Sequence, residues 1–558
     1  MLMEVGLDGI ILSLSGDISS YTEQEILGFG ENLPAIEQRI EFTDFLESST
    51  QYSYPFFRIS DEKLDFISIP ASPPLEIYCA KSQRGNDLYS DDFFEICTSI
   101  GSVSESSVSI EHFIDHWTFP TGSTYFKEVK RLVPGVSYKY ENGKVVSFQN
   151  GQKTREVTKA TDAQIYQGFK DGIDNTISMQ ADKLNNGLFL SGGVDSVLLG
   201  MVMQKLDIPF KGYTSIVTPA FNSSDEDNYD SQLISKKLGW EHETISNNLD
   251  DLSIDYIDDV LFSMPMSSHI CFHFISLVAK MKEDGLSVGF SGQNMDSLYN
   301  LGPTSRLSFN MSSMADTLRR SFLTDQYFSS MKNVLGGNWL ENLIWKSLGS
   351  IGKTAYNSFK GGGYCQPKNS EQLVHNYCHS NDYIVFTNAK EKAMGNSDAC
   401  HKPILPQNVR GELLQYKINN FLMTGAPQSI YQSGRVKEFD VMLPYSSEIM
   451  VDVFKQFSMG YKDILQPKRY VYQYIKELSG QSYDQLLQGR KTSAEMSYHN
   501  WSVLALEKSK FGQSLVNYVG DLDRPKGFTD AQMLQRYLAH YWKKKIFSKL
   551  AELNVEIL

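Results

Sequence analysis

The segment that most clearly indicates a functional site is SGGVDS at residues 191–196, a glycine turn that carries one acidic side chain. The four residues before it (187–190, GLFL) form an apolar run typical of a buried strand, and apolar residues recur at helical spacing after it. A strand, a glycine turn and a helix together present unpaired backbone N–H groups and the positive end of a helix dipole to an anion. The pattern predicts a phosphate-binding loop, with an ordinary strand-to-helix turn as the alternative.

The polar groups of this loop suit a nucleotide polyphosphate that carries a divalent cation. Glycines let the backbone approach a phosphate closely, and serine hydroxyls add hydrogen-bond donors. Asp195 would repel the phosphates unless a cation lay between them, so we expect Mg²⁺ to bridge this carboxylate to the phosphates. The residues expected to contact the nucleotide are Leu190, Ser191, Gly192, Gly193, Asp195 and Ser196.

The segments around this loop alternate between strand and helix patterns. Strands are expected at 210–217, 241–245 and 286–290, and helices at 161–184, 225–238 and 255–284, the last one interrupted near Pro265. Such alternation predicts a parallel, doubly wound sheet whose ligands bind at the carboxyl ends of the strands. A second serine–glycine pair, Ser291-Gly292, follows the last of these strands, so we expect it to lie beside SGGVDS.

The rest of the chain divides into a strand-rich part and a helical part. Residues 1–155 contain short apolar runs separated by turn residues, with a hairpin expected over 138–148. Residues 301–400 lack a clear periodicity and form either a lid over the site or a surface insertion. Beyond Gln407 the pattern is mostly helical, apart from a short apolar interruption at 441–445. We predict an α/β protein with one domain at 1–155 and a second at 156–558.

Composition argues against several classes of function. The 558 residues carry a formal charge of −14, whereas an extended nucleic-acid interface is normally basic. The sequence has no apolar run of about 18 residues and no signal-peptide pattern at its start, so we expect no membrane insertion and a cytoplasmic location. Six cysteines without a CxxC pair disfavour a zinc ribbon and a disulfide framework.

With its two loops the sequence resembles the asparagine synthetase family, which binds ATP and cleaves it between the α- and β-phosphates to adenylate a carboxylate. The family's second loop typically reads SGxGxDE. Residues 291–297 read SGQNMDS, with Asn294 in place of the second glycine and Ser297 in place of the last acid. The resemblance implies an N-terminal Ntn-hydrolase-like α+β sandwich, followed by a doubly wound, parallel-sheet ATP pyrophosphatase domain with a helical C-terminal part. It also implies ATP and Mg²⁺ as cofactors.

The same resemblance assigns roles around the second loop. Ser291 and Gly292 match positions that contact the nucleotide, and Asp296 matches the acid that joins Asp195 in holding magnesium. The strand TSIV at 214–217 resembles the family's adenine-contacting strand, which implies that the backbone around Ile216 meets the base. A helix cap is the alternative role for Asp296.

Three charged residues of the C-terminal half match the family's catalytic region. Lys468 begins a segment, KRYVY, that resembles the family's KxxLR, and a lysine there would neutralise charge on the α-phosphate and on the oxyanion of acyl transfer. The segment VMLPY at 441–445 resembles the family's RVPFLD, which makes Asp440 or Glu438 a candidate base for the attacking amine. A solvated lysine on a helix face is the alternative for Lys468.

The N-terminal part resembles the family's glutaminase domain in two segments, PLEIY at 74–78 and FKEVKRLVPGVSY at 126–138. The nucleophile of that domain is a cysteine freed at the mature N-terminus, with its own amine as the base. Here the first cysteine is Cys79. We therefore expect no glutamine hydrolysis and a scaffolding role for this domain, as in the β-lactam synthetase and lasso-peptide cyclase relatives.

The expected activity is that of an AMP-forming carbon–nitrogen ligase. It would adenylate a small-molecule or peptide carboxylate and transfer the acyl group to ammonia or to a substrate amine, in specialised-metabolite, peptide macrolactam or polysaccharide biosynthesis. An asparagine synthetase that uses ammonia is the alternative within this class. A non-catalytic nucleotide-binding paralogue and a tRNA-modifying enzyme are alternatives from other classes. A homodimer and partner proteins from the same biosynthetic cluster are candidate assemblies, and no nucleic-acid or membrane partner is expected.

Overall fold

The computed structural model describes part of the chain, and every structural statement concerns that part. It comprises residues 2–5, 11–15, 18–20, 26–29, 55–60, 63–116, 119–141, 144–149, 161–182, 184–218, 224–248, 255–266, 272–299, 414–415, 418–419, 422, 426–456, 468–487, 509–524 and 530–558. The predicted lid or insertion at 301–400 lies outside these residues. None of the helices within them is both long enough and apolar enough to cross a bilayer.

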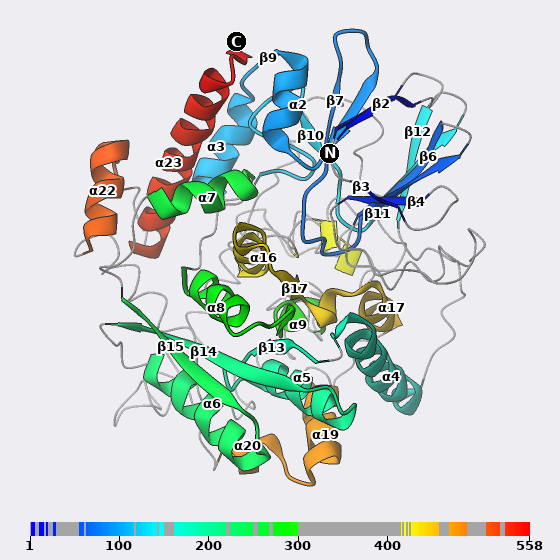
Figure 1. The fold of residues 1–558 in the computed structure, drawn as a ribbon, viewed down its shortest axis with the longest axis vertical. Helices are drawn as coiled ribbons and strands as arrows, with labels where there is room; N and C mark the ends of the chain where they lie inside the picture. Colours follow the sequence, from blue (N-terminus) through cyan, green and yellow to red (C-terminus); the bar gives the residue numbers. More distant parts are fainter. Residues whose placement is uncertain are drawn as a thin grey trace, which may run out of the picture.

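A five-stranded parallel sheet forms the centre of the second half of the molecule (Figure 1). The strand order is β15-β14-β13-β16-β17, and every neighbouring pair is parallel. The strands are β13 (Asn186–Phe189), β14 (Phe210–Thr218), β15 (His242–Asn248), β16 (Val288–Ser291) and β17 (Asp440–Met442). The predicted parallel sheet is confirmed, and the apolar interruption predicted at 441–445 is its fifth strand. Because β17 is separated from β16 by about 150 residues, only tertiary pairing reveals it as part of the sheet.

Alternating side chains of the strands fill two separate cores, one on each face of this sheet. Leu188 of β13 joins the core beneath α4, α5 and α19, whereas its neighbour Phe189 joins the core beneath α8 and α16. Tyr213 and Val441 also point to the second face. Helices on both faces make this a doubly wound sheet, as the alternating sequence pattern predicted.

The helices that follow the strands begin and end close to the predicted positions. α4 (Asp162–Gln180) begins at Thr161, whose hydroxyl accepts from the backbone N–H of Gln164 in a capping box. The interruption predicted near Pro265 separates α7 from α8. The others are α5 (Val194–Lys205), α6 (Ser224–Leu238), α7 (Asp255–Ser263), α8 (Phe272–Glu283), α9 (Met295–Tyr299), α16 (Ala426–Lys437), η5 (Pro444–Ser446), α17 (Glu448–Gln456), α19 (Arg469–Ser479), α20 (Tyr483–Leu486), α22 (Lys510–Val519) and α23 (Asp530–Glu552).

In the described residues of the N-terminal part, two antiparallel sheets lie beside the helices α2 and α3. The first sheet has the order β10-β7-β8-β1-β2 and the second β12-β11-β6-β5-β4-β3. Their strands are β1 (Leu2–Val5), β2 (Ile11–Ser15), β3 (Ile18–Ser20), β4 (Ile26–Phe29), β5 (Phe56–Ser60), β6 (Lys63–Ser68), β7 (Tyr78–Lys81), β8 (Asp87–Ser90), β10 (Lys130–Arg131), β11 (Val136–Glu141) and β12 (Lys144–Gln149). The helices are α2 (Phe93–Ile100) and α3 (Ser107–His116). The predicted hairpin is β11–β12. The Ntn-type arrangement of this part and the domain boundary at 155 stay predictions.

The C-terminal end of the chain returns to the N-terminal part. α23 shares a core with α2 and α3, in which Trp542 and Tyr125 are fully buried. Beyond it, β18 (Glu556–Ile557) pairs in parallel with β9 (Ser102–Val103). Figure 1 shows α23, in red, beside the blue helices of the N-terminal part. The helical C-terminal part therefore packs against both halves of the molecule.

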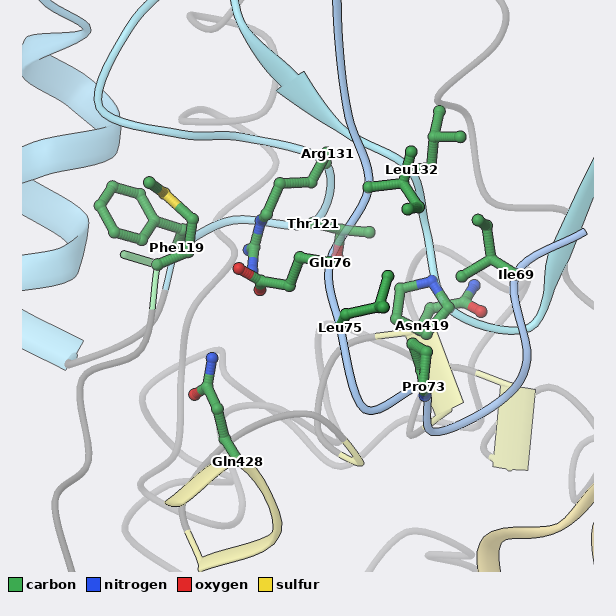
Figure 2. Close-up of a pocket in the computed structure, with 14 residues that line it drawn as sticks. Ile69, Pro73, Leu75, Glu76, Phe119, Thr121, Arg131, Leu132, Asn419 and Gln428 are labelled. Carbon is green, nitrogen blue, oxygen red and sulfur yellow. The ribbon is translucent and has the colours of Figure 1, made fainter. Parts of the chain in front are cut away.

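The junction between the two halves is hydrogen-bonded and contains a small pocket. The backbone N–H of Ala71 donates to Glu448 Oε1 at 2.8 Å, and the Tyr431 hydroxyl donates to the Ser72 carbonyl at 3.0 Å. In the adjoining pocket Arg131 Nη1 lies 2.6 Å from Glu76 Oε1, and Figure 2 shows the two side chains pointing toward each other. No residue of the SGGVDS or SGQNMD loop lines this pocket.

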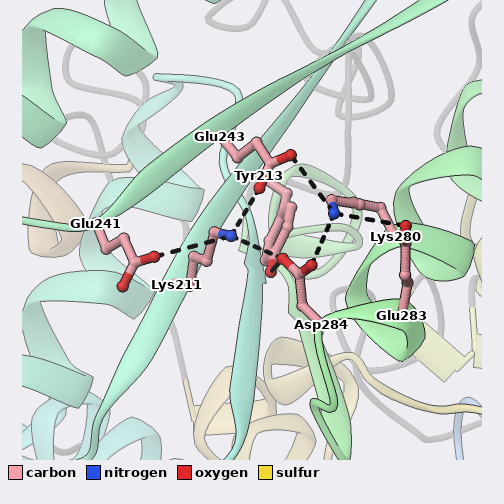
Figure 3. Close-up of polar contacts among 7 residues, drawn as sticks. All are labelled: Lys211, Tyr213, Glu241, Glu243, Lys280, Glu283 and Asp284. Carbon is pink, nitrogen blue, oxygen red and sulfur yellow. Dashed lines mark hydrogen bonds and ion pairs between the residues drawn. The ribbon is translucent and has the colours of Figure 1, made fainter.

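A cluster of charges closes the amino-terminal edge of the parallel sheet (Figure 3). Asp284 accepts from Lys211 Nζ at 2.7 Å and from the Tyr213 hydroxyl at 2.6 Å, and it lies 2.8 Å from Lys280 Nζ. Lys211 also lies 2.6 Å from Glu243, so the cluster joins β14, β15 and the end of α8. These contacts hold the pKa of the Asp284 carboxyl well below its usual range, chiefly through the hydrogen bond from Lys211.

Replacing Asp284 with asparagine should lower the free energy of unfolding at pH 7 by about 1.5 to 3 kcal/mol, because hydrogen bonds to charged donors are lost. A depressed carboxyl pKa stabilises the fold above the unfolded-state value of about 3.9, and this contribution disappears as the pH falls toward the lower folded-state pKa. Urea unfolding of the parent and D284N at pH 7 and pH 3 should therefore show a difference that shrinks at pH 3. Equal stabilities at pH 7 would contradict the prediction.

Candidate active site

The SGGVDS loop joins the carboxyl end of β13 to the first turn of α5. Gly192 has φ +74°, and a Cβ built on it would lie 2.8 Å from both Asp230 Cβ and the backbone nitrogen of Ser231. Backbone conformation and space thus both require glycine here. Gly193 caps α5 without a side-chain hydrogen bond, which leaves the first N–H groups of the helix for a ligand.

Two serine hydroxyls mark the side of the loop to which its amides point. The N–H of Gly193 donates to Ser191 Oγ at 3.2 Å, and the N–H of Ser191 reaches Ser196 Oγ at 3.4 Å. Ser196 Oγ in turn donates to the Gly193 carbonyl at 3.0 Å. Acceptor oxygens therefore fit on this side of the loop, as phosphate oxygens would.

The second loop lies directly against the first. Phe189 pairs with Ser291 across β13 and β16, so the two strands end together. A Cβ on Gly292 would lie 2.9 Å from the backbone nitrogen of Ser196 and 3.1 Å from Asp195 Cβ. The prediction that the two serine–glycine pairs are neighbours is confirmed, and Gly292 is needed for this close approach.

Asn294 adopts the conformation for which glycine is usual at its position. Its φ is +71°, in the left-handed region that asparagine tolerates better than most residues. The side-chain amide donates to Ser446 Oγ at 2.8 Å and to the Leu422 carbonyl at 3.3 Å. The substitution of asparagine for the family's glycine is thus accommodated, and it adds a link to the segment after β17.

Lys468 brings the two loops together through their carboxylates. Its Nζ lies 2.6 Å from Asp195 Oδ2 and 2.8 Å from Asp296 Oδ1. The lysine precedes α19 with φ 59° and ψ 30°, a left-handed conformation that is costly for a residue with a Cβ. Three residues separated by up to 273 positions in the sequence therefore meet at the carboxyl edge of the sheet.

The electrostatics of this trio favour a charged lysine and a perturbed Asp195. Burial raises the pKa of Asp195 to about 6; Lys468 opposes this shift, and Asp296 adds to it. Burial also disfavours the Lys468 ammonium, but the two carboxylates outweigh this effect and raise its pKa. The site therefore holds a cation between its two acids.

The residues present fit a magnesium ion held by two carboxylates. Asp195 Oδ1 is buried, and no hydrogen-bond donor of the described residues reaches it, so this oxygen is available as a ligand. Asp296 is 69% exposed, which leaves its second oxygen accessible. Within the described ranges no group of three His, Cys, Asp or Glu side chains gathers around one point, so phosphate oxygens and water would complete the shell.

Comparison with known proteins agrees with this geometry. The family model described as asparagine synthase matches residues 169–344. The chain carries an asparagine synthase domain. Members of that family are ligase-type enzymes that use ATP, so the presence of this domain indicates an ATP-dependent, ligase-type function. No curated protein sequence gave a significant match.

Among solved structures, the chain is similar to NMN synthetase from Francisella tularensis. The identity is 14%, and the match covers 41% of this chain and 98% of that one, with a TM-score of 0.19.

The remaining predicted residues fall at different edges of the sheet. Ile216 lies near the carboxyl end of β14, at the same edge as the loops, and its carbonyl accepts from Asn247 Nδ2 at 3.2 Å. Asp440 begins β17 opposite Val288, about 10 Å along the strand before the level of Ser291. Glu438 is 88% exposed and pairs with Lys282. The structure therefore does not bring Asp440 or Glu438 to the cluster formed by Lys468, Asp195 and Asp296.

Three hydroxyl groups that were not among the predicted site residues lie against the first loop of the asparagine synthase domain. They belong to Thr214, Tyr445 and Tyr483. The two tyrosines donate to backbone carbonyls of the loop, and Thr214 donates to the carbonyl of Leu190, directly before it. Tyr445 lies in a segment that the family resemblance already pointed to. Thr214 likewise begins the TSIV segment at 214–217, which resembles the family's adenine-contacting strand. Tyr483 carries no sequence signal, since a tyrosine in a short helix is an ordinary core residue.

Proposed function

We propose that this protein is an AMP-forming ligase, which activates a carboxylate as its acyl-adenylate with release of pyrophosphate and then joins it to an amine. The observation that carries the proposal is the position of Lys468 Nζ, within 2.8 Å of a carboxylate from each of the two loops. A fixed cation beside a phosphate-binding loop suits a reaction in which negative charge develops on phosphate and acyl oxygens.

Each part of the site has a role in this reaction. The N–H groups of the SGGVDS loop and of the first turn of α5 bind the β- and γ-phosphates, and the serine hydroxyls add donors. Asp195 and Asp296 would hold Mg²⁺, which when bound neutralises charge on the pyrophosphate leaving group. Lys468 stabilises charge on the α-phosphate during adenylation and on the oxyanion during acyl transfer. The backbone at Ile216 is proposed to meet adenine.

The amine is proposed to be ammonia or an amino group of the substrate itself. The described residues include two cysteines, Cys79 and Cys97. Cys97 lies in the core of the N-terminal part, and burial raises the pKa of its thiol, which makes it a poor nucleophile. Cys79 lies within β7, paired with Lys130, so it has no free amine of its own to act as the base. Neither thiol therefore suits glutamine hydrolysis, which supports a scaffolding role for the N-terminal part.

The carboxylate is proposed to belong to a small molecule or a peptide of a specialised biosynthetic pathway, with aspartate and ammonia as the alternative substrates of an asparagine synthetase. The test incubates the intact protein with ATP, Mg²⁺ and a panel of such carboxylates. Each carboxylate is supplied once with ammonium and once in a form that carries an amino group of its own. We expect AMP and pyrophosphate to form with one of them. Formation of ADP and phosphate with the accepted substrate would overturn the proposal.

A further inference from the structure

Three buried hydroxyl groups, from three different segments of the chain, donate to backbone carbonyls of the SGGVDS loop and of Leu190, the residue directly before it. Thr214 of β14 donates to the Leu190 carbonyl, Tyr483 of α20 to the Gly192 carbonyl, and Tyr445 of η5 to the Asp195 carbonyl, the last at 2.9 Å. The side chains are 3%, 9% and 0% exposed, respectively. We propose that these three hydroxyls, here called the carbonyl clamp, orient the loop for binding phosphate; this inference rests on the proposed function.

The geometry of the peptide bond gives the clamp its effect. In a trans peptide the C=O and the following N–H point in opposite directions, so fixing one fixes the other. A carbonyl held at Leu190 turns the N–H of Ser191 to the opposite side, and a carbonyl held at Gly192 does the same for Gly193. These are the two N–H groups that meet the serine hydroxyl oxygens on the anion side of the loop.

Without the clamp, the loop could turn carbonyl oxygens toward the anion. Gly192 has no Cβ and a positive φ, so the peptide bond that follows it can rotate more freely than one that follows a residue with a side chain. A carbonyl oxygen facing phosphate would repel it, whereas an N–H attracts it. Tyr483 therefore holds the carbonyl of Gly192, the loop residue whose backbone no side chain of its own restricts.

The other two hydroxyls extend the same arrangement to the ends of the loop. Tyr445 holds the backbone of Asp195, which bears the proposed metal-binding carboxylate. Thr214 Oγ1 lies 2.7 Å from His242 Nε2; because the hydroxyl donates to Leu190, the ring nitrogen must donate to the hydroxyl. Burial lowers the pKa of His242, which is consistent with a neutral ring that donates from Nε2. All three are positioning residues, since they act through the loop.

The test measures binding of ATP with Mg²⁺ to the intact protein by calorimetry, with the thermal unfolding midpoint as a measure of stability. Tyr483→Phe removes one hydroxyl and should weaken ATP binding by about 3- to 10-fold, the range expected for one hydrogen bond. Adding Tyr445→Phe should weaken it further. The matched control is Tyr431→Phe, because Tyr431 is equally buried and donates to a backbone carbonyl at the domain junction.

Three outcomes are decisive. Weaker ATP binding in Tyr483→Phe than in Tyr431→Phe, at similar thermal midpoints, supports the clamp. Parental affinity in Tyr483→Phe, or equal weakening in both variants, overturns it. If the parent protein itself does not bind ATP, the proposed function is wrong, and so is the role proposed for the carbonyl clamp. Should Tyr483→Phe not fold, Thr214→Val removes another clamp hydroxyl without changing side-chain shape and is judged against the same control.

Discussion

Replacing Lys468 with methionine should slow AMP formation by about 100- to 1,000-fold, the loss typical of removing one group that stabilises transition-state charge. Methionine keeps an unbranched side chain only one heavy atom shorter than lysine, but it has no charge for the α-phosphate or the oxyanion. The measurement is the rate of pyrophosphate release from ATP at saturating substrate, with the carboxylate identified in the substrate panel. The loss should appear in kcat, because the charge develops in the transition state.

The control for this experiment is Lys545→Met, which also removes a partly buried lysine. Lys545 Nζ lies 2.6 Å from Asp258 Oδ2 and joins α23 to α7, away from the two loops. Its replacement should leave kcat within about twofold of the parent, since a single partly exposed ion pair contributes little. Equal loss of activity in the two variants, or a parental rate in Lys468→Met, would refute the assigned role.

The same variant should bind a divalent ion more tightly when no nucleotide is present. In the structure the Lys468 ammonium lies between the two carboxylates that are proposed to hold magnesium. Removing this cation leaves the carboxylates uncompensated, so we expect the affinity for Mn²⁺, measured by electron paramagnetic resonance, to rise about tenfold. An unchanged affinity would mean that Lys468 and the metal do not share these carboxylates.

Replacing Asp195 with asparagine should lower pyrophosphate release by about 100- to 1,000-fold, because the proposed Mg²⁺ would lose a ligand and, with it, several kcal/mol of charge stabilisation. Asp195 has a buried Oδ1 that no described donor reaches, so this oxygen is the one expected to bind the proposed Mg²⁺. Asp296→Asn should have a smaller effect, since this side chain is 69% exposed and water can take its place. Both variants should also lose affinity for ATP with Mg²⁺.

A matched control is Asp174→Asn, which changes a residue of α4 that pairs with the last residue of α5. Asp174 pairs with Lys205 at 2.5 Å and accepts from the Tyr474 hydroxyl, so it is a carboxylate of the same domain in a structural role. This variant should retain the activity and ATP affinity of the parent. If Asp195→Asn also retains them, Asp195 does not hold the proposed Mg²⁺.

The candidate site was predictable to different degrees in its different parts. The SGGVDS loop is a local feature, because its glycines, helix start and strand are adjacent in sequence. Lys468 could be proposed only through resemblance to a family, and its contact with both loops depends on α19 packing against α5. Asp440 and Glu438 were predicted by the same resemblance, yet they lie toward the opposite edge of the sheet from the cluster. Their proposed role as a base therefore has no support in the geometry.

By itself, the sequence determined the strand, turn and helix around SGGVDS, the parallel sheet and the acidic residues of the two loops. Hydrophobic periodicity and glycine conformation act over a few residues, so such features can be deduced locally. The tertiary structure alone decided which distant side chains complete the loop. The hydroxyls of Tyr445 and Tyr483 reach it from segments about 250 and 290 residues further along the chain, and β17 pairs with β16 across about 150 residues. Such contacts depend on how whole elements pack, which no local pattern of residues encodes.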